Sequence, residues 1–74
     1  MEVCMPRLGF SMEEGRLVDW LVADGAEIAE GAPLYAIEGD KAVQEVESPA
    51  TGRVRIIAAP DEIYAVGTVL CEIN

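Results

Sequence analysis

Short apolar runs separated by glycine and proline form the pattern of this 74-residue chain. Single glycines stand at Gly9, Gly15, Gly25, Gly31, Gly39, Gly52 and Gly67, and prolines at Pro6, Pro33, Pro49 and Pro60. The runs between them hold about four to eight residues, which is the usual length of a strand and too short for most helices. Helical spacing is not sustained anywhere. The pattern therefore predicts an all-β fold.

The apolar runs predict several strands and the turns between them. The strand-like segments are residues 17–22, a short run at Ile28, and residues 34–38, 43–47, 52–57 and 68–73. Residues 23–26 (Ala-Asp-Gly-Ala) predict a turn, in which Gly25 suits a positive φ. Ser48 and Pro49 end the strand that precedes them.

The second half of the chain repeats part of the first. Residues 15–17 (Gly-Arg-Leu) resemble residues 52–54 (Gly-Arg-Val), at an offset of 37. Residues 31–34 followed by Ile37 resemble residues 67–70 followed by Ile73, at an offset of 36. Two similar halves predict a flattened barrel or sandwich with approximate two-fold symmetry, which would leave few free strand edges.

The two central strand-like segments predict a β-hairpin. In the register that follows from a short turn, Ile37 opposes Gln44 and Tyr35 opposes Val46. Since side chains alternate along a strand, Tyr35, Ile37 and Val46 then share one face, which we expect to be buried.

The only lysine of the chain, Lys41, stands at the tip of this predicted hairpin. It follows Gly39 and Asp40, which are typical turn residues. A primary amine, unlike the guanidinium of the other cations, can be acylated to a neutral amide. Lys41 is therefore either a modification site or an ordinary turn residue.

Composition limits the classes of function. The chain has 14 acidic and 5 basic residues, a formal net charge of −9 and no histidine. An acidic surface repels nucleic acid and anionic membranes, although the same charge also serves solubility. Without histidine the chain lacks the usual general base and the commonest metal ligand. We therefore expect no catalytic residues, no metal site, and no nucleic-acid or membrane partner.

Two further groups of residues have structural interpretations. Cys4 and Cys71 match neither a metal-binding pair nor a disulfide framework, and we expect two reduced, packed cysteines. The acidic pairs at residues 13–14 and 61–62 have no recognisable nucleophile beside them, so we interpret them as solvated charges.

A series of short motifs runs through nearly the whole chain. The central one is Asp-Lys-Ala at residues 40–42, in the context Glu-Gly-Asp-Lys-Ala. Around it lie Met-Pro-Arg-Leu-Gly at residues 5–9, Met-Glu-Glu-Gly at 12–15, Trp20, Asp24, Gly25, Gly31, Leu34, Ser48, Pro49 and Gly52. In this order the motifs resemble the lipoyl domain of 2-oxo acid dehydrogenase complexes, within the biotinyl/lipoyl attachment superfamily. The resemblance implies a single lipoyl domain over residues 1–74, with two four-stranded antiparallel sheets, quasi-two-fold symmetry and the lipoyl-lysine at a hairpin tip.

The sequence departs from this family in two places. Gly39 stands where the family commonly has threonine or serine, and residues 61–63 lie in a variable region with no clear strand assignment. A biotinyl domain is the related alternative, but its attachment lysine normally lies between methionines, whereas Lys41 lies between Asp40 and Ala42. A β-sandwich interaction domain with an unmodified lysine is the other alternative.

The resemblance implies a carrier domain that is not itself an enzyme. Lipoate would be joined to Lys41 through an amide by a lipoate ligase or lipoyl synthase system. A thiamine-diphosphate-dependent 2-oxo acid decarboxylase would reductively acylate the swinging arm. The acyl group would pass to coenzyme A at a dihydrolipoamide acyltransferase core, and dihydrolipoamide dehydrogenase would reoxidise the dithiol. The cofactor would supply the chemistry, and the tethered domain would present the cofactor to each active site.

The resemblance also implies recognition residues. Candidates for recognition by the modifying enzyme are Glu38, Asp40 and Ala42, although Asp40 is equally explained as a turn residue. The candidates for recognition by the decarboxylase are Gly9, Phe10, Ser11 and Met12. Phe10 is either an exposed contact or a cover for the core, and Trp20 is expected in the core.

We expect the chain to be an excised domain of a longer dihydrolipoamide acyltransferase. Its expected location is the cytoplasm of a bacterium, or the mitochondrial matrix in a eukaryote. Pyruvate, branched-chain, 2-oxoglutarate and acetoin systems share these motifs, so the sequence does not select among them.

Overall fold

The computed structural model describes residues 1–7, 11–39 and 42–74. The strands in these ranges are β1 (Glu2–Cys4), β2 (Glu14–Trp20), β3 (Glu27–Ile28), β4 (Pro33–Glu38), β5 (Val43–Glu47), β6 (Gly52–Ile56), β7 (Glu62–Ala65) and β8 (Val69–Ile73). The prediction of an all-β fold is confirmed. Within the same ranges, no helix is long and apolar enough to cross a membrane.

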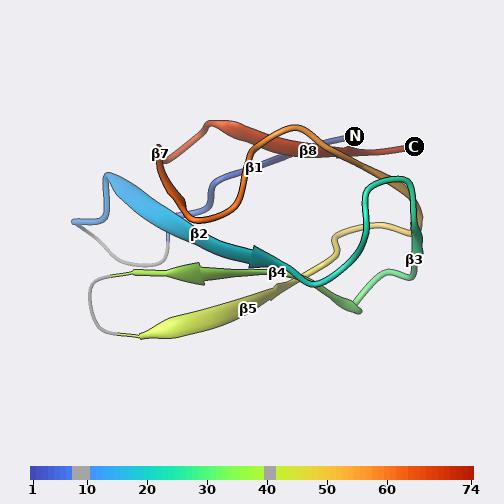
Figure 1. Cartoon of the computed structure of the whole chain (residues 1–74), viewed down its shortest axis with the longest axis horizontal. Coiled ribbons are helices and arrows are strands. Elements are labelled where there is room, and N and C mark those ends of the chain that lie inside the picture. Colours follow the sequence, from blue (N-terminus) through green and yellow to red (C-terminus); the bar gives the residue numbers. More distant parts are fainter. Residues whose placement is uncertain (8–10, 40–41) are drawn as a thin grey trace.

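The strands form two four-stranded antiparallel sheets, with the orders β1-β8-β6-β3 and β5-β4-β2-β7. The sheets make a flattened sandwich with extents of 32 × 20 × 18 Å (Figure 1). The predicted sandwich is confirmed, but the sheets are not closed into a barrel. Because no strand of one sheet pairs with the other, β1, β3, β5 and β7 remain edge strands, contrary to the expectation of few free edges.

The sequence repeat corresponds to a structural repeat. Strands β5, β4, β2 and β7 of one sheet occupy the same order as β1, β8, β6 and β3 of the other. At equivalent positions between the halves, Gly25 and Asp61 both have a positive φ, of 85° and 64°. The Gly25 N–H donates to the Val54 carbonyl at 2.7 Å, and the Asp61 N–H donates to the Leu17 carbonyl at 2.6 Å. Each half thus ties its turn to the central strand of the other, as the predicted quasi-two-fold symmetry requires.

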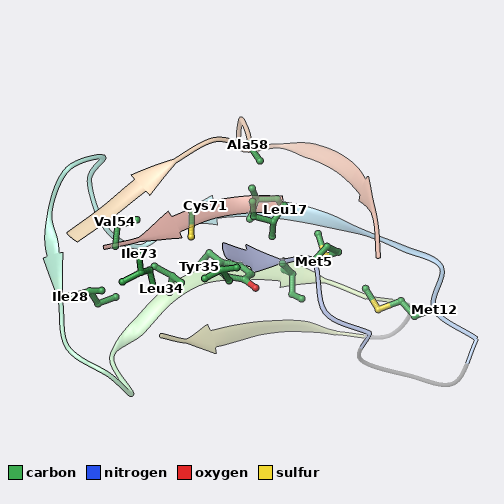
Figure 2. Close-up of a cluster of buried hydrophobic side chains, with 13 residues drawn as sticks. Met5, Met12, Leu17, Ile28, Leu34, Tyr35, Val54, Ala58, Cys71 and Ile73 are labelled. Atoms are coloured by element: carbon green, nitrogen blue, oxygen red, sulfur yellow. The ribbon is translucent and has the colours of Figure 1, made fainter. Parts of the chain in front are cut away.

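The core lies between the two sheets (Figure 2). Its buried members are Val3, Met5, Met12, Leu17, Ile28, Leu34, Tyr35, Ile37, Val54, Ala58, Leu70, Cys71 and Ile73. Trp20 is half-buried and packs against them. Its ring lies edge-on to the ring of Tyr35, with the two ring centroids 5.4 Å apart. Its indole N–H donates to the Ala58 carbonyl at 2.9 Å. Trp20 therefore serves the core, as expected, with its one polar atom satisfied.

The β4–β5 hairpin has the predicted register. Tyr35 pairs with Val46 and Ile37 pairs with Gln44. Tyr35 and Ile37 are buried, and Val46 is half-buried at the edge of the sheet. The expected buried face is therefore confirmed.

Strand β2 differs from its predicted bounds of residues 17–22. It begins at Glu14 and ends at Trp20, because Glu14 and Arg16 pair with β7 and Arg16 also pairs with β4. The polar residues at its start face outward, which weakens the apolar signal in the sequence. The short edge strands β1 and β7 gave no clear signal for the same reason: few of their side chains are buried.

The two cysteines differ in exposure. Both are free thiols; Cys71 is buried, as expected, whereas Cys4 is exposed. Side chains alternate along β1, so that Val3 enters the core and Cys4 faces solvent. The expectation that Cys4 is packed is therefore wrong.

Two buried groups that lose a proton at high pH, the Cys71 thiol and the Tyr35 hydroxyl, predict a loss of stability in alkali. Burial raises the pKa of Cys71 to about 11 and that of Tyr35 to about 12, from ordinary values of 9.0 and 10.0. The unfolded chain releases these protons first, so the stability contributed by both groups is complete below pH 9 and is lost as pH rises toward 12. The loss is on the order of 2 kcal/mol per group. We expect the Tm to be flat from pH 7 to 8 and to fall from pH 9 to 11.

Two cysteine variants separate this effect from general alkaline damage. Cys71→Ala should show a shallower fall in Tm than the wild type, whereas Cys4→Ala should follow the wild type. Parallel curves for Cys71→Ala and the wild type would contradict a contribution from the buried thiol.

Candidate functional site

The β4–β5 hairpin stays regularly paired up to its last described residues. Glu38 pairs with Val43, and the Gly39 N–H donates to the Ala42 carbonyl at 3.1 Å. Asp40 and Lys41 lie between Gly39 and Ala42 in sequence and outside the described residues. The predicted attachment site is thus bracketed by a strand pair whose position the sheet fixes.

This end of the hairpin and the chain termini lie at opposite ends of the long axis. Figure 1 shows both the N- and C-terminus at the end away from where β4 ends and β5 begins. The end of β4 and the start of β5 therefore lie far from either terminus.

Arg16 of β2 joins the hairpin to the neighbouring strands. Its Nη1 lies 3.7 Å from Glu38 Oε1, and its Nη2 donates a hydrogen bond to Asp61 Oδ1. The hydrogen bond and charge of Asp61, with a smaller contribution from Glu38, raise the pKa of Arg16 above its ordinary value. Asp61 is a solvated charge, as interpreted from sequence, since its side chain is 70% exposed, and it is also an ion-pair partner of Arg16.

An open groove of about 180 Å³ adjoins the turn end of the hairpin. It is lined by Glu14, Gly15, Arg16, Glu38, Gly39 and Ile63. A Cβ at Gly15 would lie 2.5 Å from Met12 Cε and 3.3 Å from Met5 Sδ, so any side chain there would displace these two core methionines. The core thus closes the inner side of the sheet, and the groove offers a contact surface.

The segment predicted to recognise the decarboxylase is only partly described. Gly9 and Phe10 lie outside the described residues, whereas Ser11 is exposed in a turn. Met12 is only 4% exposed and lies at the hairpin end of the core (Figure 2). Its side chain therefore has little surface to offer a partner, and Ser11 is the described member of this segment that can make such a contact.

The described side chains at the turn end of the hairpin are carboxylates, one guanidinium and aliphatic groups. They can orient a turn or contact a partner, while the chemistry would come from a group attached to the turn. Sequence reasoning missed Arg16, Val43 and Ile63 in this region. The repeat held a signal for Arg16, since Gly-Arg recurs at residues 15–16 and 52–53.

Comparisons with known proteins agree with this geometry. A biotin/lipoyl family model, described as "Biotin-requiring enzyme", matches residues 1–73. The chain is 43% identical over 67 residues to the dihydrolipoyllysine-residue acetyltransferase component of the acetoin cleaving system of Pseudomonas putida, covering 89% of this chain and 18% of that protein. It is 38% identical over 74 residues to the acetyltransferase component of the pyruvate dehydrogenase complex of Corynebacterium glutamicum, covering 99% and 11%.

A further relative belongs to another component of such a complex. The chain is 40% identical over 70 residues to the pyruvate dehydrogenase E1 component subunit beta of Rhizobium meliloti, covering 92% of this chain and 15% of that protein. The chain thus spans less than a fifth of each of these three relatives.

Proposed function

The chain belongs to the biotin/lipoyl family, and on that premise we propose that it carries lipoate as a swinging arm within a 2-oxo acid dehydrogenase complex. The observation that carries this proposal is the β4–β5 hairpin, which is paired up to Glu38 and Val43. A hydrogen bond from the Gly39 N–H to the Ala42 carbonyl joins the two residues that flank residues 40–41 in sequence. Several relatives are named for a dihydrolipoyllysine residue, which supports lipoate over biotin.

The described neighbours of Lys41 fit a covalently attached arm. Among the described residues, a Cβ added at Gly39 would meet no atom within 4 Å, and Ala42 is exposed. The described parts of the chain therefore leave both flanks of residues 40–41 open. Lipoate joined to the Lys41 amine would supply a dithiolane that takes up an acyl group on reduction and gives it up by transfer.

The residues of this chain would position and present that arm. The strand pair fixes where the turn begins and ends, so that a modifying enzyme meets the amine at a defined place. Glu38 and Ala42 are the described candidates for this recognition, with Asp40 between them in sequence. Tethering raises the effective concentration of the arm at each active site, which makes weak docking sufficient.

The proposed partners follow from this role. They are a thiamine-diphosphate-dependent 2-oxo acid decarboxylase, a dihydrolipoamide acyltransferase core, dihydrolipoamide dehydrogenase, and a lipoate ligase or lipoyl synthase system. We propose a dihydrolipoamide acyltransferase in a bacterial cytoplasm as the parent protein, in which the domain itself is not catalytic.

Modification followed by acylation tests the proposal. After incubation with lipoate, ATP and a lipoate ligase, we expect the intact mass to rise by one lipoyl group. The lipoylated domain should then be reductively acylated by at least one of the pyruvate, acetoin, branched-chain and 2-oxoglutarate decarboxylases. The decarboxylase with the highest kcat/KM identifies the complex.

A known lipoyl domain serves as the positive control for ligase activity. A chain that stays unmodified beside a modified control would refute the proposal. Modification by a biotin ligase instead would establish the biotinyl alternative, and no modification by either enzyme would favour the interaction domain.

A further inference from the structure

One row of side chains crosses the outer face of the hairpin-bearing sheet. Ile63 of β7 pairs with Arg16 of β2, Arg16 with Glu38 of β4, and Glu38 with Val43 of β5. Directly paired residues of antiparallel strands share a face. The positions that follow Arg16 in β2 and precede Glu38 in β4 are fully buried in the core. The row therefore points away from the core, at the end of the sheet where the β4–β5 hairpin turns.

Aliphatic side chains stand at both ends of this row. Ile63 is 61% exposed and Val43 is 53% exposed. They lie three strand spacings apart, roughly 14 Å, with the Arg16–Glu38 ion pair between them. A single exposed aliphatic residue is ordinary. Two in one row, beside the proposed attachment site, fall within the footprint of one protein contact.

The other sheet shows that the fold does not require an aliphatic residue at position 63. In the equivalent row, Glu27 pairs with Arg53, and Arg53 exchanges backbone hydrogen bonds with Asn74. Glu27 occupies the place of Ile63, and its carboxylate lies 3.9 Å from Arg53. The same strand pairing thus accepts an exposed charge, so the apolar character of Ile63 serves something other than the backbone pairing.

The outer faces also differ in charge. Carboxylates on the outer face of the hairpin-bearing sheet are Glu14, Asp19, Glu38, Glu45 and Glu47. Arg16 is the one cation among the described residues of β5, β4, β2 and β7. The opposite sheet has Arg53 and Arg55, which form ion pairs with Glu27 and Glu72. The excess of negative charge thus lies on the sheet that bears the hairpin.

We propose that this outer face docks the 2-oxo acid decarboxylase that acylates the arm. The decarboxylase would contact it through a basic surface of its own, with apolar contacts at Ile63 and Val43. We call it the acidic face, defined by the row Ile63–Arg16–Glu38–Val43 and the carboxylates Glu14, Asp19, Glu45 and Glu47. This inference rests on the proposed function and names the surface that the partner contacts. The decarboxylase must approach the hairpin to receive the arm, and the acidic face adjoins the hairpin. Lysine or arginine on the partner complements the excess carboxylates, and burial of Ile63 and Val43 adds affinity.

Threonine substitutions in the row test the docking surface. Ile63→Thr and Val43→Thr keep a β-branched side chain suited to a strand while replacing apolar surface by a hydroxyl. Ile57→Thr is the matched control, because Ile57 is 52% exposed and follows β6 in the opposite sheet. Each variant is lipoylated, checked by intact mass and thermal unfolding, and assayed with the decarboxylase that acylates the wild type most efficiently.

We expect the KM for the lipoylated domain to rise about five- to tenfold in Ile63→Thr and in Val43→Thr, with kcat unchanged. Ile57→Thr should stay within about twofold of the wild type. Added salt should raise the KM of the wild type, because it screens the carboxylates from a basic partner.

Two outcomes would overturn this inference while the wild type is still lipoylated and acylated. The first is an equal KM in the row variants and in Ile57→Thr. The second is a rise in KM only for the lipoate ligase, which would make that enzyme the occupant. Failure of the wild type to take up lipoate, or to be acylated by any decarboxylase, would instead refute the proposed function, and the wild-type assays separate the two cases.

Discussion

Lys41→Arg should take up no lipoyl group and should not be reductively acylated by any decarboxylase. Arginine keeps the positive charge of the turn but has no primary amine that a ligase could acylate at neutral pH. Since Lys41 is the only lysine of the chain, we expect the loss to be complete at the detection limit of intact-mass measurement. Reductive acylation, followed by transfer of a labelled acyl group, should be lost with it.

The one other amine that could take up lipoate is held far from the turn end of the hairpin. The α-amino group of Met1 donates a hydrogen bond to the Ile73 carbonyl at 2.9 Å, and the N-terminus lies at the opposite end of the molecule from where β4 ends and β5 begins (Figure 1). A lipoyl mass that persists in Lys41→Arg would place the attachment at this amine and overturn the assignment of Lys41. The Tm of the variant should stay near that of the wild type, since turn substitutions of this kind change stability by about 0.5 kcal/mol or less.

Leu17→Ala should destabilise the domain by about 3 kcal/mol. Leu17 lies on the inner face of β2, is 0% exposed, and packs in the core between the sheets. Truncation removes buried apolar surface and leaves a cavity that the strands on both sides can close only in part. A domain of this size has a total stability of about 4–11 kcal/mol, so the loss is a large fraction of it.

Urea unfolding followed by tryptophan fluorescence measures this loss, because Trp20 packs half-buried against the core. Leu21→Ala is the matched control: Leu21 is 40% exposed and lies just beyond the end of β2. We expect a cost below about 1 kcal/mol there. Similar midpoints for the two variants would show that Leu17 is not a principal core residue.

Much of the fold follows from local sequence. The central strands β4 and β5 could be predicted with their register because a two-residue period and a short turn fix which residues oppose each other. The quasi-two-fold arrangement could be predicted from the repeat. The edge strands β1 and β7 could not, since they are short and their pairing depends on strands far away in sequence.

The site divides in the same way. The Asp-Lys-Ala motif and the turn residues around it identify Lys41 from sequence alone. The contact of Arg16 with Glu38 and Asp61 could not be foreseen, because these residues are 22 and 45 positions away from Arg16. They meet only when β4 and β7 flank β2. From the sequence, Met12 is expected at a partner contact, but its side chain is buried. This burial likewise depends on the tertiary structure, because the end of the Met12 side chain packs against Gly15 of β2.

The sequence by itself determined the local properties: the strands other than β1 and β7, the hairpin with its register, the repeat and the single acylable amine. These depend on neighbours along the chain, where turn residues and side-chain alternation act directly. The tertiary structure alone decided that the sheets stay open, that Cys4 faces solvent, and that Ile63, Arg16, Glu38 and Val43 form one row. Each of these depends on pairing between distant strands, which sets the face on which a side chain emerges.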